Sequence, residues 1–294
     1  MTTIVSGADY LSLPRSPETW LVEPLIPVGG AALIYGDPKA GKSYAALQLA
    51  LSLQAGSEWL GFHIPRPVRP IYIQLDTPRS LWADRLETLT RHGTMGIDSL
   101  LFGDLGTFDT WPFDILNPLH AELLARAVKE TQADVVFIDT LRECHSGEEN
   151  DSTTMKAVMS SLIAACHPAA MVLIHHSKKP SVDRNGNPVP IDLLNDARGG
   201  YIVGKMDAIV RVTGNPVGKL DFIGRSIEQD SLPLERVSDG TWKVLGTEYD
   251  HWLPSVMANG NLNSIEAKAQ ALADLTSRPV CLCRPQIRRA WQTS

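Results

Sequence analysis

The stretch Gly36-Asp37-Pro38-Lys39-Ala40-Gly41-Lys42-Ser43 decides the fold class of this chain. It fits the pattern G-x-x-x-x-G-K-[S/T], in which glycines let backbone N–H groups converge on a phosphate without a clashing Cβ. Lys42 is expected to reach the β- and γ-phosphates, and the Ser43 hydroxyl to bind Mg²⁺. We assign this phosphate loop, with Tyr44 behind it, to binding ATP and Mg²⁺. The alternative is a glycine-rich turn with an incidental Lys-Ser pair.

Strand-like and helical patterns alternate on both sides of the phosphate loop. The apolar runs with the length of a strand buried on both faces are 31–35, 71–73, 135–138, 171–174 and 208–210. The candidate helices between them are 42–54, 80–92, 118–131 and 152–166. This alternation predicts an α/β fold with a mainly parallel central sheet. The loop then joins a buried strand to a helix N-terminus, where the helix dipole also favours a phosphate.

The pattern changes after about Val212. The short strands expected there are 219–225, 232–237 and 241–245, with Asp239-Gly240 as a hairpin turn signal between the last two. They predict a small antiparallel extension of the sheet. Helical patterns follow at 264–275, with Ser264 as N-cap, and at 284–291. We therefore divide the chain into an extended lead-in (1–28), an ATPase domain (29–246) and a helical basic tail (247–294).

Composition excludes several classes of protein. The 294 residues carry a formal charge of −6, and 44% are hydrophobic, which excludes disordered and collagen-like chains. Four cysteines are too few for a disulfide scaffold and indicate a reducing compartment. No apolar run reaches the roughly 18 residues that span a bilayer, and the start of the chain has no secretory pattern. We therefore expect a cytoplasmic protein without membrane contact.

A second carboxylate for Mg²⁺ is predicted at Asp139, which ends the apolar run 135–138. A carboxylate at the C-terminal end of a buried strand faces the ligand crevice of an open α/β sheet. Asp76, after the run 71–73, is our candidate for the general base that activates the attacking water. For each aspartate the alternative is a capping role at the next segment.

Two adjacent histidines, His175 and His176, follow the run 171–174. A polar group at this strand end is placed to sense the γ-phosphate. A zinc pair is disfavoured, because adjacent residues on a strand point to opposite faces. The pattern Cys281-x-Cys283 has no matching second pair, so a metal knuckle is not supported either.

Arg198 and Arg211 are candidates for an arginine finger. In ring-forming ATPases a neighbouring subunit supplies an arginine that stabilises the charge of the transition state. The alternative is that each is a surface arginine, paired with Asp196 or Asp207.

In their order, these motifs resemble the RepA/DnaB-like branch of the RecA-fold P-loop ATPases, the plasmid- and phage-type hexameric replicative helicases. The motifs that carry the resemblance are 20–22, 36–43, 72–76, 137–140, 174–176 and 198–200. The similarity runs from about Trp20 to Leu245.

The resemblance implies an ATP-driven hexameric ring that translocates on single-stranded DNA. It implies that Lys42 and Ser43 hold nucleotide and Mg²⁺, that Asp139 is the second metal-side acid, and that one histidine is the phosphate sensor. The family usually has glutamate where this chain has Asp76, so hydrolysis is expected to be slower or to use a bridging water. Since no amino-terminal helical domain or primase is visible, a primase or a replication initiator is expected as partner.

DNA contacts are expected in the segment 178–196, which opens with Lys178 and Lys179 and contains Arg184. Lysine and arginine contacts to phosphates dominate non-specific binding. The segment has no aromatic residue, so base stacking is not supported, and a plain surface loop is the alternative. The acidic balance argues against coating DNA from outside and is compatible with a few channel lysines. The tail, with arginines at 278, 284, 288 and 289, is expected to form a separate contact, either with DNA or with an acidic face of a neighbour.

Two other functions stay open. One is a RecA-like DNA-binding ATPase that acts as recombinase or recombination mediator without unwinding. The other is an ATP-binding regulator that assembles without tracking DNA. Particle symmetry separates the first two functions, because a closed ring favours the helicase and a helical filament the recombinase.

Overall fold

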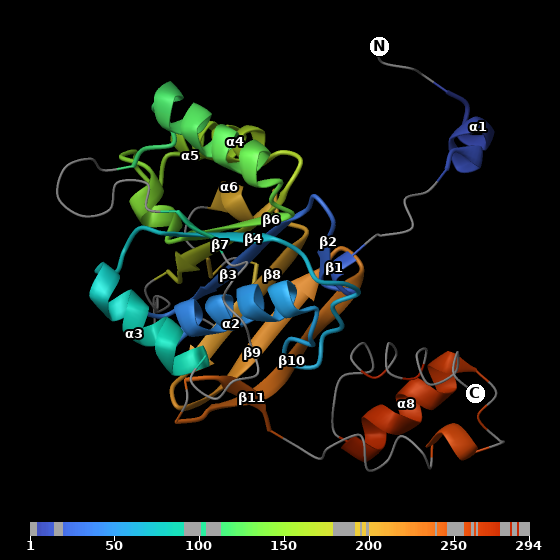
Figure 1. The fold of residues 1–294 in the computed structure, drawn as a ribbon. Coiled ribbons are helices and arrows are strands. Elements are labelled where there is room, and N and C mark those ends of the chain that lie inside the picture. The colour runs from blue at the N-terminus through green and yellow to red at the C-terminus, as the bar shows by residue number, and fades with distance from the viewer. Residues whose placement is uncertain are drawn as a thin grey trace, which may run out of the picture.

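A nine-stranded mixed sheet forms the centre of the molecule in the computed structural model (Figure 1). The structure describes residues 5–14, 20–90, 101–103, 113–178, 192–194, 196–197, 200–238, 240–245, 256–259, 262, 264–276, 283 and 287. The strand order is β11-β10-β9-β8-β3-β7-β6-β4-β5. The strand β3 lies between β7 and β8, and the next strand in sequence, β4, lies further along the sheet. Such a change in strand order leaves a ligand crevice at the carboxyl ends of the strands.

Parallel pairing covers the strands from β8 to β5. These strands are β3 (Ala31–Gly36), β4 (Pro70–Gln74), β5 (Leu101–Gly103), β6 (Val135–Asp139), β7 (Ala170–His176) and β8 (Ala208–Gly214). Every residue of β3, β4 and β6 is buried, as expected for a sheet covered on both faces. The α/β fold with a mainly parallel sheet is thus confirmed. The strand β5 was not predicted, because three residues make too short an apolar run.

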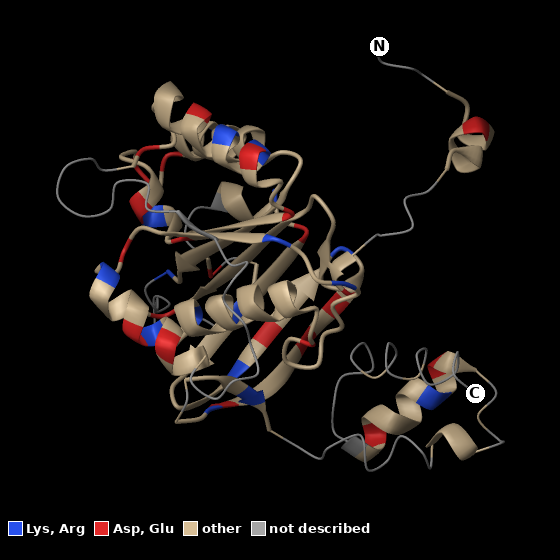
Figure 2. Cartoon of the chain, in the orientation of Figure 1, with Lys and Arg blue, Asp and Glu red and all other residues tan. Residues whose placement is uncertain are grey.

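The expected antiparallel extension is present at one edge of the sheet. It comprises β9 (Val217–Gly224), β10 (Ile227–Arg236) and β11 (Trp242–Val244), which pair in succession with β8. β8 continues to Gly214, past the predicted end at 210, because β9 pairs with it along its length. Acidic and basic residues are interspersed along this extension (Figure 2).

Helices cover both faces of the sheet. The helices α2 (Lys42–Ala55) and α3 (Arg79–Thr90) pack on one face, and α4 (Pro118–Thr131), α5 (Ser152–Cys166) and the short α6 (Gly200–Val203) pack on the other. Asn117 and Asp151 explain where α4 and α5 begin, because their side chains accept hydrogen bonds from the first free backbone N–H groups. A 3₁₀ turn, η1 (Leu141–Cys144), follows β6.

The sequence predicted an extended segment over residues 1–28. The structure differs, because part of this segment is helical. Residues Gly7–Ser12 form the helix α1, whose cap Ser6 accepts a hydrogen bond from the Asp9 N–H. Strands β1 (Trp20–Val22) and β2 (Ile26–Pro27) then pair with each other. Leu21 and Val22 are buried in the apolar cluster of the α2 face, so this segment packs on the ATPase core.

The C-terminal part has an apolar cluster of its own. The helix α8 (Ile265–Thr276) supplies Ala269, Leu272 and Ala273, which pack with Val256, Cys283 and Ile287. Ser264 caps this helix as expected, since its hydroxyl accepts from the Ala267 N–H at 3.0 Å. The expected helix 284–291 lies almost wholly outside the described residues. In the described part of the chain, no helix is long and apolar enough to cross a membrane.

Candidate nucleotide site

The phosphate loop connects β3 to α2, as predicted. Gly41 has φ +87°, a left-handed conformation that favours glycine, and a side chain at Gly36 would collide with the Val212 carbonyl. Lys42 is buried at the start of α2, and its Nζ donates to the Asp37 carbonyl oxygen at 2.8 Å. Burial lowers the pKa of Lys42, and the negative charges of Asp139 and Asp37 act in the opposite direction. The lysine is therefore folded over the loop that would hold the phosphates.

Asp139 and Ser43 meet at the carboxyl ends of the strands. Asp139 is 2% exposed, and the Tyr72 hydroxyl donates to its Oδ2 at 2.8 Å. Burial raises the pKa of Asp139, and hydrogen bonds from Tyr72 and Ser43 lower it. A cation beside this buried carboxylate would also lower its pKa, so the pair fits Mg²⁺.

A Mg²⁺ ion held by Ser43 and Asp139 would take its other ligands from nucleotide and water. Among the residues that the structure describes, no group of three or more His, Cys, Asp and Glu side chains could hold a metal by itself. This donor set agrees with a P-loop site, in which phosphate oxygens complete the coordination.

The two histidines lie on opposite faces of the sheet. Alternate β7 residues Val172 and Ile174 belong to the cluster of the α2 face, whereas Met171 and Leu173 belong to the other cluster. His176 continues the α2 side and is the register neighbour of Gly36. His175 is fully buried on the other side, with its Nε2 3.7 Å from Glu149 Oε1. Of the two candidates, His176 is therefore the one placed beside the phosphate loop.

The end of β4 carries Gln74, which the sequence analysis did not single out. Gln74 is buried beside Asp139, its neighbour on β6, and its Nε2 is without a hydrogen-bond partner in the described part of the chain. Asp76 lies beyond the strand end and is exposed. It is close enough for its negative charge to raise the pKa of Asp139. Asp76 thus borders the site, as its candidate role requires.

A family model described as an AAA domain, AAA_25, matches residues 3–182. The match covers more than half of the chain, from before the phosphate loop to beyond the two histidines. This chain belongs to the AAA_25 family. It is a P-loop ATPase with the RecA fold.

The chain is also similar to a protein of known structure. A solved structure similar to this AAA_25 chain is that of a KaiC-like protein from the hyperthermophilic archaeon Pyrococcus horikoshii OT3, with 13% identity and a TM-score of 0.48. The similarity covers 76% of this chain and 93% of that one. Among curated proteins, no sequence matches this chain significantly.

Arg211 lies on β8 of the AAA_25 protein and is buried within its own chain. Its Nη2 is 3.3 Å from Asp196 Oδ2, the ion pair that the sequence analysis gave as the alternative to a finger. Burial raises the pKa of Asp196, and the charge of Arg211 opposes that shift. In this conformation the Arg211 guanidinium is paired within its own chain. Arg198 lies outside the described residues, so both finger assignments stay predictions.

The Tyr44 ring, which follows the phosphate loop in sequence, lies close to two arginine side chains. The Arg236 guanidinium carbon lies 4.5 Å from the centre of the Tyr44 ring, and that of Arg85 lies 5.7 Å from it. Arg85 also lies over the Trp82 ring, and its Nη1 donates to Thr77 Oγ1 at 3.3 Å. Its charge lowers the pKa of Asp139. The sequence did not indicate Arg85, because only the tertiary structure brings α3 to this site.

Trp242 of β11 packs against the phosphate loop at Gly41. Its Nε1 donates to the Gly41 carbonyl oxygen at 3.2 Å, and a side chain at Gly41 would meet its ring. The Trp242 backbone exchanges two hydrogen bonds with the Gln48 side chain, at 2.8 and 3.0 Å. The antiparallel edge of the sheet is thereby attached to the helix that begins at Lys42.

Of the predicted DNA-contact residues, Lys178 is described and exposed. Its backbone N–H donates to the Asp196 carbonyl oxygen at 2.7 Å. Lys179 and Arg184 lie outside the described residues.

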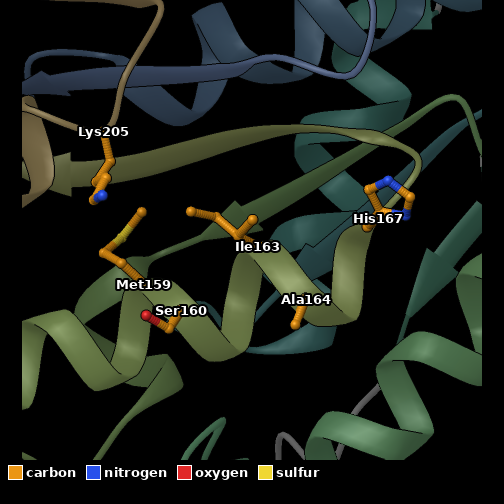
Figure 3. Close-up of a pocket in the computed structure, with 6 residues that line it drawn as sticks. All are labelled: Met159, Ser160, Ile163, Ala164, His167 and Lys205. Carbon is orange, nitrogen blue, oxygen red and sulfur yellow. The ribbon is translucent and has the colours of Figure 1, made fainter. Parts of the chain in front are cut away.

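A hollow of about 480 Å³ lies elsewhere, along the C-terminal half of α5 (Figure 3). Met159, Ile163, His167 and Lys205 are among the residues that line it. A smaller adjoining hollow includes Gly29 and Gly30, which precede β3. The phosphate loop follows the opposite end of β3, so neither hollow belongs to the nucleotide site.

Proposed function

We propose that this ATPase is a ring-forming motor that translocates on single-stranded DNA, of the helicase type, in plasmid- or phage-like DNA replication. The observation that carries the proposal is that β7 ends beside the phosphate loop and leads into the basic segment. His176 lies beside Gly36 of the phosphate loop, and Lys178 is exposed only two residues later, where the basic segment begins. Loss of the γ-phosphate at His176 can thereby move a DNA-contacting loop directly.

Self-assembly is part of this proposal. The site within one chain has Lys42, Ser43 and Asp139, but its Arg211 is engaged with Asp196. We infer that a finger arginine comes from a neighbouring copy, either as Arg198 or as Arg211 released from Asp196. Single-stranded DNA, further copies in a hexameric ring, and a primase or replication initiator are the proposed partners.

Forked-duplex unwinding and DNA-stimulated ATPase activity test the proposal. We expect ATP-dependent strand separation, faster ATP hydrolysis with single-stranded DNA, and closed six-fold particles in electron micrographs with an ATP analogue. A helical filament without unwinding would favour a recombinase or mediator. ATP binding without any DNA stimulation would favour a regulator and contradict the motor.

A further inference from the structure

Gln74 is a buried amide without a protein partner at the nucleotide site. It ends β4 and is 7% exposed. In the described part of the chain, its Nε2 has no hydrogen-bond partner and is itself shielded from solvent. Burying an amide donor without an acceptor costs free energy, so native proteins keep few such groups.

Another glutamine of this chain shows the usual outcome. Gln48 in α2 is 8% exposed, nearly the same as Gln74. Its Oε1 accepts from the Trp242 N–H, and its Nε2 donates to the Trp242 carbonyl oxygen. Both ends of that amide are therefore satisfied by protein. The Gln74 amide, unlike that of Gln48, is therefore available to an acceptor from a ligand or from water.

The position of Gln74 indicates where that acceptor would be. Along β4, Tyr72 lies on the α2 face of the sheet and Ile73 on the other, so Gln74 is again on the α2 face. Its register neighbour on β6 is Asp139, which shares a hydrogen bond with Ser43. The Gln74 amide thus lies on the same face of the sheet as Asp139, Ser43 and the first turn of α2.

We propose that Gln74 is a further catalytic-site residue, whose Nε2 donates a hydrogen bond to a terminal phosphate oxygen of bound ATP. A phosphate oxygen is a charged acceptor, and hydrogen bonds to charged acceptors are the strong ones. The contact would distinguish a triphosphate from a diphosphate. The inference rests on the P-loop ATPase assignment and needs no DNA.

Gln74→Met tests the contact, because it keeps the length of the side chain and removes the amide. The affinities of the full chain for Mg²⁺–AMP-PNP and Mg²⁺–ADP are measured without DNA, with kcat for ATP. We expect the AMP-PNP affinity and kcat to fall about tenfold or more, as for loss of a hydrogen bond to a charged group. The ADP affinity should stay within about twofold, because ADP lacks the terminal phosphate.

Gln48→Met is the matched control, since it removes an amide that bonds only to protein. It should lower thermal stability and change both nucleotide affinities by the same factor. Gln74→Glu is the second variant, should methionine impair folding. Its affinity for AMP-PNP, and not for ADP, should fall as rising pH ionises the new carboxylate.

An unchanged ratio of the two affinities in Gln74→Met and Gln74→Glu would overturn the inference, whether both affinities stay as in wild type or fall together. An internal water as the partner of Nε2 would give that result. The outcome is distinct from failure of the motor proposal, which appears as absent unwinding with both nucleotide affinities of the wild-type chain intact.

Discussion

At the scale of single residues, the nucleotide site depends on a few buried charges. Lys42 and Asp139 are both shielded from water, and each has its pKa shifted by burial against its ordinary value. Tyr72 and Ser43 give Asp139 hydrogen bonds that favour its ionised form and so oppose the effect of burial. The sequence indicated Lys42, Ser43 and Asp139, because each occupies a definite place in a local motif. Tyr72 was not indicated, because its partner lies on another strand.

Replacing Lys42 by alanine should abolish ATP hydrolysis. The variant removes the positive charge that would reach the β- and γ-phosphates, and only the loop amides would remain to hold them. Turnover of ATP measures the effect, with circular dichroism as the control for folding. Normal turnover in a folded Lys42→Ala protein would contradict the assignment of the phosphate loop.

Tyr72→Phe should shift the acid side of the pH profile. The Tyr72 hydrogen bond favours the ionised form of Asp139, so its loss raises the pKa of that carboxyl further. A protonated Asp139 cannot assist Mg²⁺, and activity should therefore begin to fall at a higher pH than in wild type. The pH dependence of kcat at saturating Mg²⁺ is the measurement. An acid limb at the wild-type position would show that Asp139 does not set it.

Asp76→Asn tests the general base. An amide cannot accept the proton of the attacking water, so kcat should fall by about 10²-fold or more while nucleotide affinity changes little. Steady-state kinetics and ADP binding separate the two effects. Undiminished hydrolysis would leave Asp76 with a capping role alone.

At the scale of elements, the phosphate loop follows the end of β3 and contacts the edge strand β11. The sequence predicted the strands and helices that carry strong apolar runs or caps, such as β6 and α5. It missed α1 and β5, because such short segments leave little periodicity to detect. The attachment of β11 to α2 through Trp242 was not predictable, since these segments are separated by 201 residues at the Gly41 contact.

Trp242→Phe and Trp242→Ala probe that attachment. Phenylalanine keeps an aromatic ring but loses the Nε1–H bond to Gly41, so we expect a several-fold rise in KM for ATP with a modest loss of stability. Alanine leaves a cavity behind the loop and should cost about 3–5 kcal/mol of unfolding free energy. Urea unfolding and ATPase kinetics measure both. A wild-type KM in both variants would show that β11 does not position the loop.

At the scale of the whole molecule, the ATPase core and the C-terminal part have separate apolar clusters. The three clusters share no residue. In the C-terminal part, Lys268 is buried, and its Nζ donates to the carbonyl oxygens of Val256, Met257 and Asn259 at 2.9 to 3.0 Å. Composition alone suggested a basic tail here, whereas the structure adds a small packed unit.

Lys268→Met should loosen that unit and spare the core. The variant leaves several carbonyl groups without their donor, which should cost about 2 kcal/mol or more within the unit. Hydrogen exchange of the α8 amides should rise, and ATP hydrolysis without DNA should stay at the wild-type rate. Protection of the core strands serves as the internal control. Loss of basal hydrolysis would mean that the C-terminal unit supports the nucleotide site.

The sequence by itself determined the α/β class, the place of the phosphate loop between a strand and a helix, and the position of Asp139, the predicted second Mg²⁺ carboxylate, at the end of a buried strand. Each of these follows from local chemistry: where a buried strand ends, which side chains follow it, and where glycine permits a left-handed turn. Only the tertiary structure decided that His176 faces the phosphate loop while His175 does not. It also decided that Arg211 pairs with Asp196, and that Gln74 lies beside Asp139 with its amide unused. The physical reason is register, because the pairing of distant strands determines which face each side chain takes and which groups it meets there.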